Sequence, residues 1–329
     1  MKRGDFAAVV FVMLGLQAGA SAQSRLQASD SDYPSRPIRM IIGNPPGGGS
    51  DLFARVVANE ISKGLRQRVI IDNRPGAGHT IASEIVAKAL PNGYTLQWIN
   101  ANFTFNPYVY GNLPYDTERD FAPVSQLVTQ PLVLVVNTSF PVGSVKDLIA
   151  MARAKPGALS ASSSGTAGAA AMTTAMFRLQ TGTDYVIVPY QGGAQAMLAL
   201  LQGEVQFYFS TTATGMETVR SGKVKVLATS SKKRLPYLPD VPTFMESGLV
   251  GLDLTPWDGI VAPAKTPRVI IDRLHRELVK ALALPNVLAH ATASGSEPIG
   301  STPDEFAAEI KRQLELSARL FKAGIIKRQ

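Results

Sequence analysis

The 329-residue chain contains no cysteine, only three histidines and few aromatic side chains. Without cysteine it has no disulfide framework, no thiol nucleophile and no thiolate metal site. The histidines His79, His275 and His290 form no spaced metal-binding pair, so the sequence predicts neither a metal nor a cofactor. Because 45% of the residues are hydrophobic, we expect stability to come from a large core, and the length suggests about two domains.

Signatures of catalysis are also missing. The chain has no Gly-x-Ser-x-Gly elbow, the turn that exposes the nucleophile of many serine hydrolases. No two carboxylates stand out at a spacing typical of an acid and base pair. The sequence therefore predicts a protein that is not an enzyme.

Long hydrophobic runs are absent except at the N-terminus. Lys2 and Arg3 precede an apolar run from Phe6 to Leu16, and Ala20-Ser21-Ala22 follows it, which is typical of a cleaved signal peptide. A short membrane anchor is the alternative, but the run is shorter than the roughly 20 residues that a spanning helix needs. A lipid anchor would need a cysteine after the cleavage point. We expect residues 1–22 to be a signal peptide, 23–33 a flexible leader, and the mature protein to be free in the periplasm.

The formal charge is +8, yet the basic residues are spread along the chain. Lys232-Lys233-Arg234 is the only basic triple, and a solvated turn accounts for it. Scattered charge and export to the periplasm both disfavour a nucleic-acid partner. The excess positive charge favours modest steering of anionic ligands instead.

Strands and helices alternate along most of the chain. A buried strand at Ile38–Ile42 is followed by an amphipathic helix, a strand at Val69–Asp72, a second helix and a strand at Tyr94–Ile99. A second cycle begins at Leu132, and Ser144 and Asp147 stand at the start of its helix with the spacing of a capping box. The chain ends in a strand near Asp253–Val261 and helices near 268–282 and 303–321, the last of which begins with Thr302 as cap and Glu305 as its partner. This order predicts an α/β protein with two mainly parallel sheets, each flanked by helices.

Two loops in front of helices carry the strongest candidate chemistry. Pro45-Pro46-Gly47-Gly48-Gly49-Ser50-Asp51 joins the first strand to its helix, and Ser162-Ser163-Ser164-Gly165-Thr166 precedes a second helix. Free N–H groups and hydroxyls at helix starts can hold an anion. The alternatives are a tight turn for the first loop, helix-capping serines for the second, or a flexible linker at 160–171.

A third candidate follows the strand that ends at Ile99. Asn102 could bond to the polar end of an aromatic acid, and Phe103 could stack on its ring. A polar loop whose phenylalanines are buried in the core is an equal alternative.

Several segments in order along the chain resemble the solute-binding receptors of tripartite tricarboxylate transporters, also called Bug receptors. The matching segments are Tyr33–Ile38, Pro46–Gly48 with Asp51 and Arg55, Asn73–Gly78, Asn92–Leu96, Asp120–Val124, Val188–Gly193, Leu238–Thr243 and Trp257 with Ala262-Pro263. The resemblance implies a two-lobed, Venus flytrap, type II-like fold in which lobe 1 comprises residues 34–130 and 255–329 and lobe 2 comprises 131–254. It also implies a carboxylate ligand between the lobes, a monomer, and one small and one large membrane subunit as partners.

Candidate ligand-binding residues follow from this resemblance. They are Gly47, Gly48, Asp51, Ser163, Ser164 and Gly165, to which we add Asn102 and Phe103 from the segment after Ile99, and Tyr190 and Ser210. Asp51 is better explained as a helix cap, since its charge would repel a carboxylate. Ser210 stands where relatives often carry an aspartate, which predicts a mono-, di- or tricarboxylate, aromatic or not, without an amino group.

Two other functions remain open at this point. The receptor could present its closed form to a signalling partner instead of a transporter. A periplasmic hydrolase with Ser164 as nucleophile is the third alternative, and it predicts turnover of an ester or amide.

Overall fold

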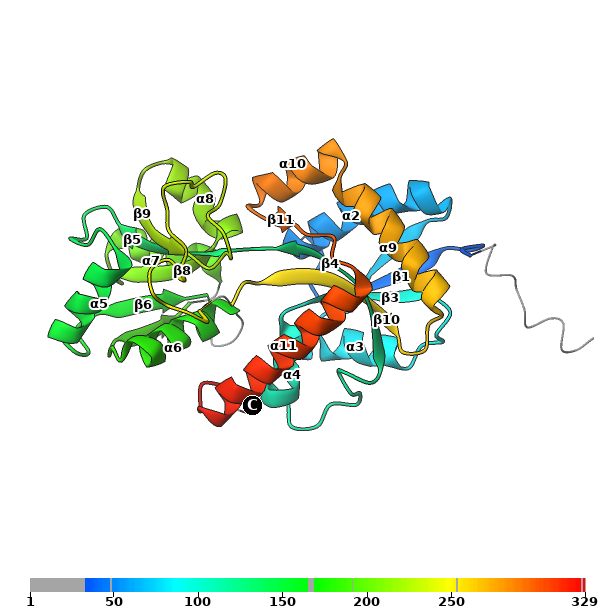
Figure 1. The fold of residues 1–329 in the computed structure, drawn as a ribbon, viewed down its shortest axis with the longest axis horizontal. Coiled ribbons are helices and arrows are strands. Elements are labelled where there is room, and N and C mark those ends of the chain that lie inside the picture. The colour runs from blue at the N-terminus through cyan, green and yellow to red at the C-terminus, as the bar shows by residue number, and fades with distance from the viewer. Residues whose placement is uncertain are drawn as a thin grey trace, which may run out of the picture.

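The protein consists of two α/β lobes that lie side by side and are joined by extended segments (Figure 1). The computed structural model describes residues 33–47, 49–164, 169–190, 192–252, 254–326 and 328. The predicted signal peptide and all but the last residue of the predicted leader lie outside this range, as do Gly48 and Gly165.

Lobe 1 is built on a sheet with the strand order β11-β4-β10-β3-β1-β2 in the described part of the chain. Its strands are β1 (Ile38–Ile42), β2 (Val69–Asn73), β3 (Thr95–Asn100), β4 (Phe121–Thr129), β10 (Trp257–Pro263) and β11 (Glu297–Pro298). One face is covered by α2 (Gly49–Leu65), α9 (Arg268–Leu282) and α10 (Pro285–Ala293). The other face carries η2 (Ala77–His79), α3 (Thr80–Ala87), α4 (Asn102–Val109) and α11 (Pro303–Lys322).

Lobe 2 repeats this plan with the order β7-β6-β8-β5-β9. Its strands are β5 (Leu132–Asn137), β6 (Ser160–Ser163), β7 (Val186–Pro189), β8 (Phe207–Thr211) and β9 (Val224–Thr229). The helices α5 (Val145–Ala154) and α6 (Ala169–Thr181) cover one face, and α7 (Gly193–Gln202) and α8 (Thr212–Arg220) cover the other.

Each sheet contains one reversed strand in its interior. β1, β2 and β3 are parallel, but β10 runs antiparallel to both β3 and β4. In lobe 2, β6, β7 and β8 are parallel, whereas β5 runs antiparallel to β8 and β9. The two α/β lobes are confirmed, with most strands of each sheet running in one direction and one interior strand reversed. The reversed strands are those that enter each lobe from the other, which sequence periodicity does not reveal.

Three elements of lobe 1 differ from the sequence prediction. β4 was not predicted because Pro123, Ser125 and Gln126 interrupt its apolar pattern, although Val124 and Leu127 are fully buried. The expected polar loop after β3 is the helix α4, and β10 begins at Trp257 rather than near Asp253.

Helix starts follow the local sequence closely. The Ser144 hydroxyl accepts a hydrogen bond from the Asp147 N–H at the start of α5. Thr302 and Glu305 form a reciprocal capping box at the start of α11, with proline in the first turn. These signals were readable because each cap depends only on residues within one turn.

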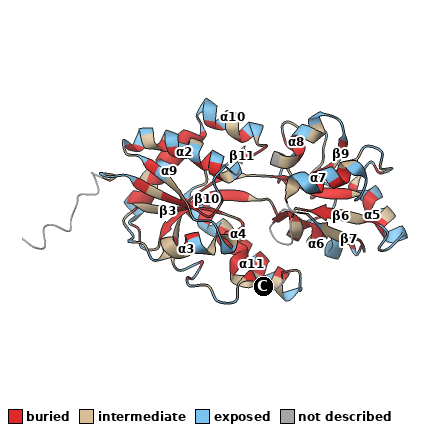
Figure 2. Ribbon diagram, turned by 180° about the vertical axis from the view of Figure 1, so that it is seen from behind, coloured by how far each residue is buried: buried red, intermediate tan, exposed pale blue. Residues whose placement is uncertain are grey.

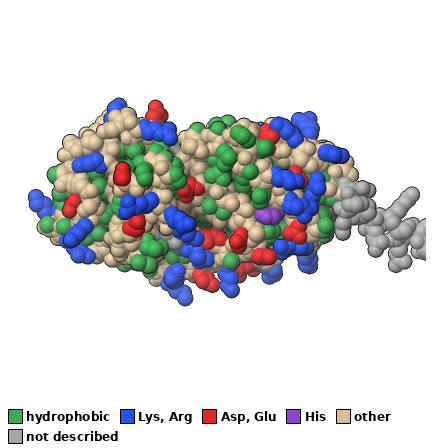
Figure 3. Space-filling model, turned by 45° about the horizontal axis from the view of Figure 1, so that its top comes forward, with side chains coloured by type: hydrophobic (Ala, Val, Ile, Leu, Met, Phe, Trp, Pro, Cys, Tyr) green, Lys and Arg blue, Asp and Glu red, His purple; other side chains and the backbone are tan. Residues whose placement is uncertain are grey.

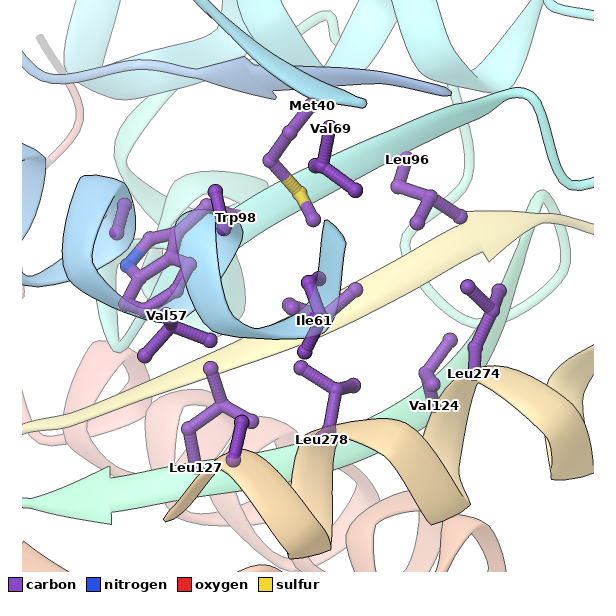
Figure 4. Close-up of a cluster of buried hydrophobic side chains, with 14 of the residues drawn as sticks. Met40, Val57, Ile61, Val69, Leu96, Trp98, Val124, Leu127, Leu274 and Leu278 are labelled. Carbon is purple, nitrogen blue, oxygen red and sulfur yellow. The ribbon is translucent and has the colours of Figure 1, made fainter. Parts of the chain in front are cut away.

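The hydrophobic cores lie between each sheet and its helices. Figure 2 shows buried residues along the strands of both lobes and exposed residues on the outer faces of the helices. In lobe 1, Val57 and Ile61 of α2 pack with Trp98 of β3 and Leu278 of α9 (Figure 4). This packing fixes the start of α2 against the ends of the central strands.

Gly259 allows α11 to lie close against β10. A Cβ atom at this position would stand 2.3 Å from the Phe306 ring and 3.0 Å from the Ser125 carbonyl oxygen. We expect Gly259→Ala to lower the free energy of unfolding in urea by about 1–3 kcal/mol, because the ring or the strand must shift. Gly111→Ala is the control, since its nearest neighbour lies at 3.8 Å. Equal stability of the two variants would contradict this packing.

Candidate functional site

A cavity of about 170 Å³ lies between the lobes, beside the segments that join them. Lobe 1 contributes Ser50, Asn100, Ala101, Asn102, Trp257 and Asp258, lobe 2 contributes Ser164, Ala169, Ala170 and Thr211, and the joining segments contribute Gln130 and Pro256. Among the described residues that line it, none is lysine or arginine. On the face drawn in Figure 3, acidic and basic side chains are interspersed rather than gathered into a patch of one sign.

The start of α2 forms the lobe 1 side of this cavity. Gly47 has a φ of 83°, a left-handed conformation that favours glycine and lets the loop turn into the helix. Its N–H donates to the Asp51 carboxylate at 2.9 Å. Ser50, in the first turn of α2, lines the cavity.

Asp51 is buried and holds the loop in place. Its carboxylate accepts hydrogen bonds from the Arg55 guanidinium at 2.9 and 3.0 Å and from the Asn73 side chain at 2.8 Å. Burial acts to raise the pKa of Asp51, but the hydrogen bonds from Arg55, Asn73 and Gly47 hold that pKa below its usual value. Asp51 therefore positions the loop, in agreement with its interpretation as a cap, and does not line the cavity.

The end of β6 and the start of α6 form the lobe 2 side. Ser164 lines the cavity together with Ala169 and Ala170, the first residues of α6. Ser163 is buried, and its carbonyl oxygen accepts the Tyr190 N–H at 2.8 Å. The starts of α2 and α6, one from each lobe, thus border the same cavity, and Gly48 and Gly165 lie outside the described residues.

Of the described candidate residues, Asn102 and Ser164 line the cavity, while Gly47, Asp51 and Ser163 support its walls. Phe103 does not line it, because it is buried and packs edge-to-face on Phe121 with ring centroids 5.0 Å apart. The alternative of a buried phenylalanine therefore describes this residue, and the expected stacking on a ligand is not supported.

Tyr190 and Ser210 also lie away from the cavity wall. The Tyr190 hydroxyl donates to the Glu204 carboxylate at 3.2 Å. Ser210 is completely buried in β8, and its hydroxyl donates to the Thr211 carbonyl oxygen at 3.0 Å. Thr211, the next residue, lines the cavity in its place.

Asp258 is the functional candidate that sequence reasoning missed. It is 2% exposed, and the Ser50 hydroxyl donates to its carboxylate at 3.2 Å. Burial raises the pKa of Asp258 to about 7, and the Ser50 hydroxyl and Trp98 indole act against that rise. The available signal was a single acidic residue inside an otherwise apolar strand, Trp257–Pro263.

The histidines show no catalytic or metal-binding arrangement. His79 interacts with Asn100, and burial lowers the pKa of its ring. None of the three histidines lines the cavity. Within the described ranges there is no cluster of three or more side chains suited to a metal ion, and no described helix is long and apolar enough to cross a membrane.

Known proteins resemble this chain over most of its length. BugT of Bordetella pertussis is 35% identical over 299 residues, which cover 89% of this chain and 92% of BugT. The structure of Rpa4515 from R. palustris with adipate is 29% identical, covers 91% of this chain and 100% of that one, and has a TM-score of 0.75. MatC from Rhodopseudomonas palustris, with bound malate, is 27% identical, covers 88% and 100%, and has a TM-score of 0.71.

Residues 53–325 match the model of the family described as the tripartite tricarboxylate transporter family receptor. The match spans both lobes and the segments that join them. The chain therefore belongs to the tripartite tricarboxylate transporter receptor family, whose members are periplasmic solute-binding proteins.

Proposed function

We propose that this receptor captures a small organic carboxylate in the cavity between its lobes and delivers it to the small and large membrane subunits of a tripartite transporter. The observation that carries the proposal is that one cavity is bordered by the starts of two helices, α2 from lobe 1 and α6 from lobe 2. The first N–H groups of a helix have no partner within it and carry partial positive charge. A cavity bordered by two helix starts is therefore suited to binding an anion.

Hydroxyl and amide groups would complete the recognition of the carboxylate. Ser50 and Asn102 line the lobe 1 side, and Ser164 and Thr211 line the lobe 2 side. Hydrogen bonds to an ionised group are stronger than neutral ones, especially in a cleft that excludes water. Adipate and malate, bound by two relatives of known structure, are small organic carboxylates.

A ligand held from both sides favours the closed arrangement of the lobes. Any ligand shifts a conformational equilibrium only by its difference in affinity for the two states. A carboxylate that contacts Ser50 and Ser164 together gains both contacts only when the lobes approach. This requirement links capture to recognition by membrane subunits, with the receptor acting as a monomer in the periplasm.

A hydrolase and a signalling receptor are the two alternative functions. A hydrolase based on Ser164 would need a base at hydrogen-bond distance, and none of the three histidines lines the cavity. We therefore propose binding without turnover. A signalling role uses the same closed form, and uptake of radiolabelled ligand by a deletion strain distinguishes it from transport.

The first test is a thermal-shift screen of the mature protein against mono-, di- and tricarboxylates, including adipate and malate. A carboxylate at about 100 times its dissociation constant should add roughly 2.7 kcal/mol to the free energy of unfolding. Uncharged amides of the same acids are the control. If no carboxylate stabilises the protein, the proposal is wrong.

The second test removes one hydroxyl from the cavity wall. We expect Ser164→Ala to weaken binding of the best carboxylate by about 1.5–3 kcal/mol in calorimetry, because a hydrogen bond to a charged group is lost. Ser221→Ala, in the exposed turn after α8, is the control and should bind as the wild type does. Unchanged affinity in Ser164→Ala would show that the ligand lies elsewhere.

A third prediction concerns the loop that precedes α2. Asp51→Asn should lower the free energy of unfolding at pH 7 by about 1–3 kcal/mol, because it removes the charge that Arg55, Asn73 and Gly47 stabilise. The pKa of Asp51 is lowered in the folded protein, so this stabilisation is present at neutral pH and is lost as the pH falls through the folded pKa. Urea unfolding at several pH values should show the two proteins converging in acid.

Asp304→Asn is the matched control for Asp51→Asn. Asp304 forms an exposed ion pair with Arg268, which solvent screens, so its loss should change stability little. A cost for Asp51→Asn no larger than that of the control would mean that Asp51 does not hold the loop.

A further inference from the structure

Asp258 places a buried carboxylate at the base of the cavity. It lies in β10 opposite Asn100 of β3 and Val128 of β4, and its side chain points to the face of the sheet that α2 covers. The residue is almost inaccessible to solvent, yet it lines the cavity between the lobes. A ligand in this cavity therefore lies against a carboxyl group.

The neighbours of Asp258 suit its ionised form. The Ser50 hydroxyl donates to Asp258 at 3.2 Å, and the Gln130 side-chain amide approaches the same oxygen to 3.5 Å. Ser50 and the Trp98 indole both act to lower the pKa of Asp258, against the larger effect of burial. Donors on several sides stabilise a carboxylate better than a carboxylic acid.

No cation in the described cavity wall balances this charge. The side chain of Arg55, on the helix nearest to Asp258, is occupied by Asp51 and Asn73. A buried charge without a partner is costly, and buried ionised groups in proteins are normally paired. Near pH 7 a proton neutralises Asp258 in about half of the molecules without ligand, and a cationic group of the ligand would take the place of that proton.

We propose that Asp258 selects a ligand that carries an ammonium group beside its carboxylate, with the carboxylate at the helix starts and the ammonium against Asp258. This inference rests on the proposed function and defines the class of ligand as an amino-carboxylate. It replaces the expectation of a ligand without an amino group, which depended on Ser210. Ser210 does not line the cavity, and the acidic group missing there is supplied by Asp258 from another strand.

The inference gives affinity a definite pH dependence. The pKa of Asp258 is about 7 without ligand, and an ammonium group would lower it, so binding is fully favoured above pH 7 and weakens below it. Affinity for an amino-carboxylate should fall about tenfold from pH 8 to pH 6. A dicarboxylate would show the opposite trend, because its binding would require Asp258 to take up a proton.

Other titratable groups near this strand should contribute little over that range. On α2, Asp51 is paired with Arg55 and its pKa is lowered. Burial lowers the pKa of His79, which interacts with Asn100, the residue opposite Asp258 in β3. Glu297 of β11 lines a separate cavity beside Trp257, whose side chain points to the opposite face of β10.

Calorimetry with matched ligands tests the inference. The first series is β-alanine, 3-hydroxypropionate and succinate, which share one carboxylate and differ only in the second group. Glycine and 4-aminobutyrate, each with its hydroxyl and carboxyl counterpart, give the same comparison at shorter and longer chain lengths. We expect an amino-carboxylate to bind at least tenfold more tightly than its counterparts. Asp258→Asn should weaken that ligand at least tenfold, abolish its pH dependence and leave the hydroxyl counterpart within about twofold.

Asp272→Asn is the matched control, because Asp272 pairs with Arg268 on the surface of α9 and should leave every affinity unchanged. The inference would be overturned if succinate bound more tightly than β-alanine and bound still more tightly to Asp258→Asn. Capture of a carboxylate would remain valid in that case. Failure of every ligand in the series and in the wider screen would overturn the proposed function itself. If Asp258→Asn does not fold, the pH dependence of binding to the wild type tests the inference. Affinity for the amino-carboxylate that falls from pH 8 to pH 6 supports it, and affinity that rises contradicts it.

Discussion

The central constraint on this molecule is the strand that each lobe receives from the other. β10 arrives from lobe 2 and inserts between β3 and β4, where all seven of its residues are buried. Trp257 packs on Phe306 of α11, while Asp258 on the opposite face meets Ser50 of α2. One strand therefore fixes the helices on both faces of lobe 1 and also forms the base of the cavity between the lobes.

The proposed recognition of an anion relies on backbone groups and hydroxyls rather than on cationic side chains. That design needs a rigid loop, because a misplaced N–H group gains little from a ligand. Asp51 supplies the rigidity by joining Gly47, Arg55 and Asn73 through a single carboxylate. The net positive charge of the chain favours attraction of anions over long distances, and in the proposed site the helix starts would hold the bound anion.

Sequence reasoning found what depends on local chemistry. The caps Ser144 and Thr302, the glycine-rich start of α2 and the cavity residue Ser164 were all predicted from their immediate neighbours. Sequence reasoning did not predict the features that depend on tertiary structure. The orientation of β10 cannot be inferred from its own residues, and Asp258 gains its role from Ser50, which is 208 positions away.

Ser210 shows the limit of inferring a ligand class from one position of a family pattern. A residue was judged by its position in a family pattern, although recognition requires only that a carboxylate reach the cavity, from whichever strand. β8 carries Ser210 buried behind Thr211, and β10 places Asp258 in the cavity from the other lobe. Specificity in a two-lobed receptor is therefore a property of the assembled cavity, because strands far apart in sequence can supply the same charge.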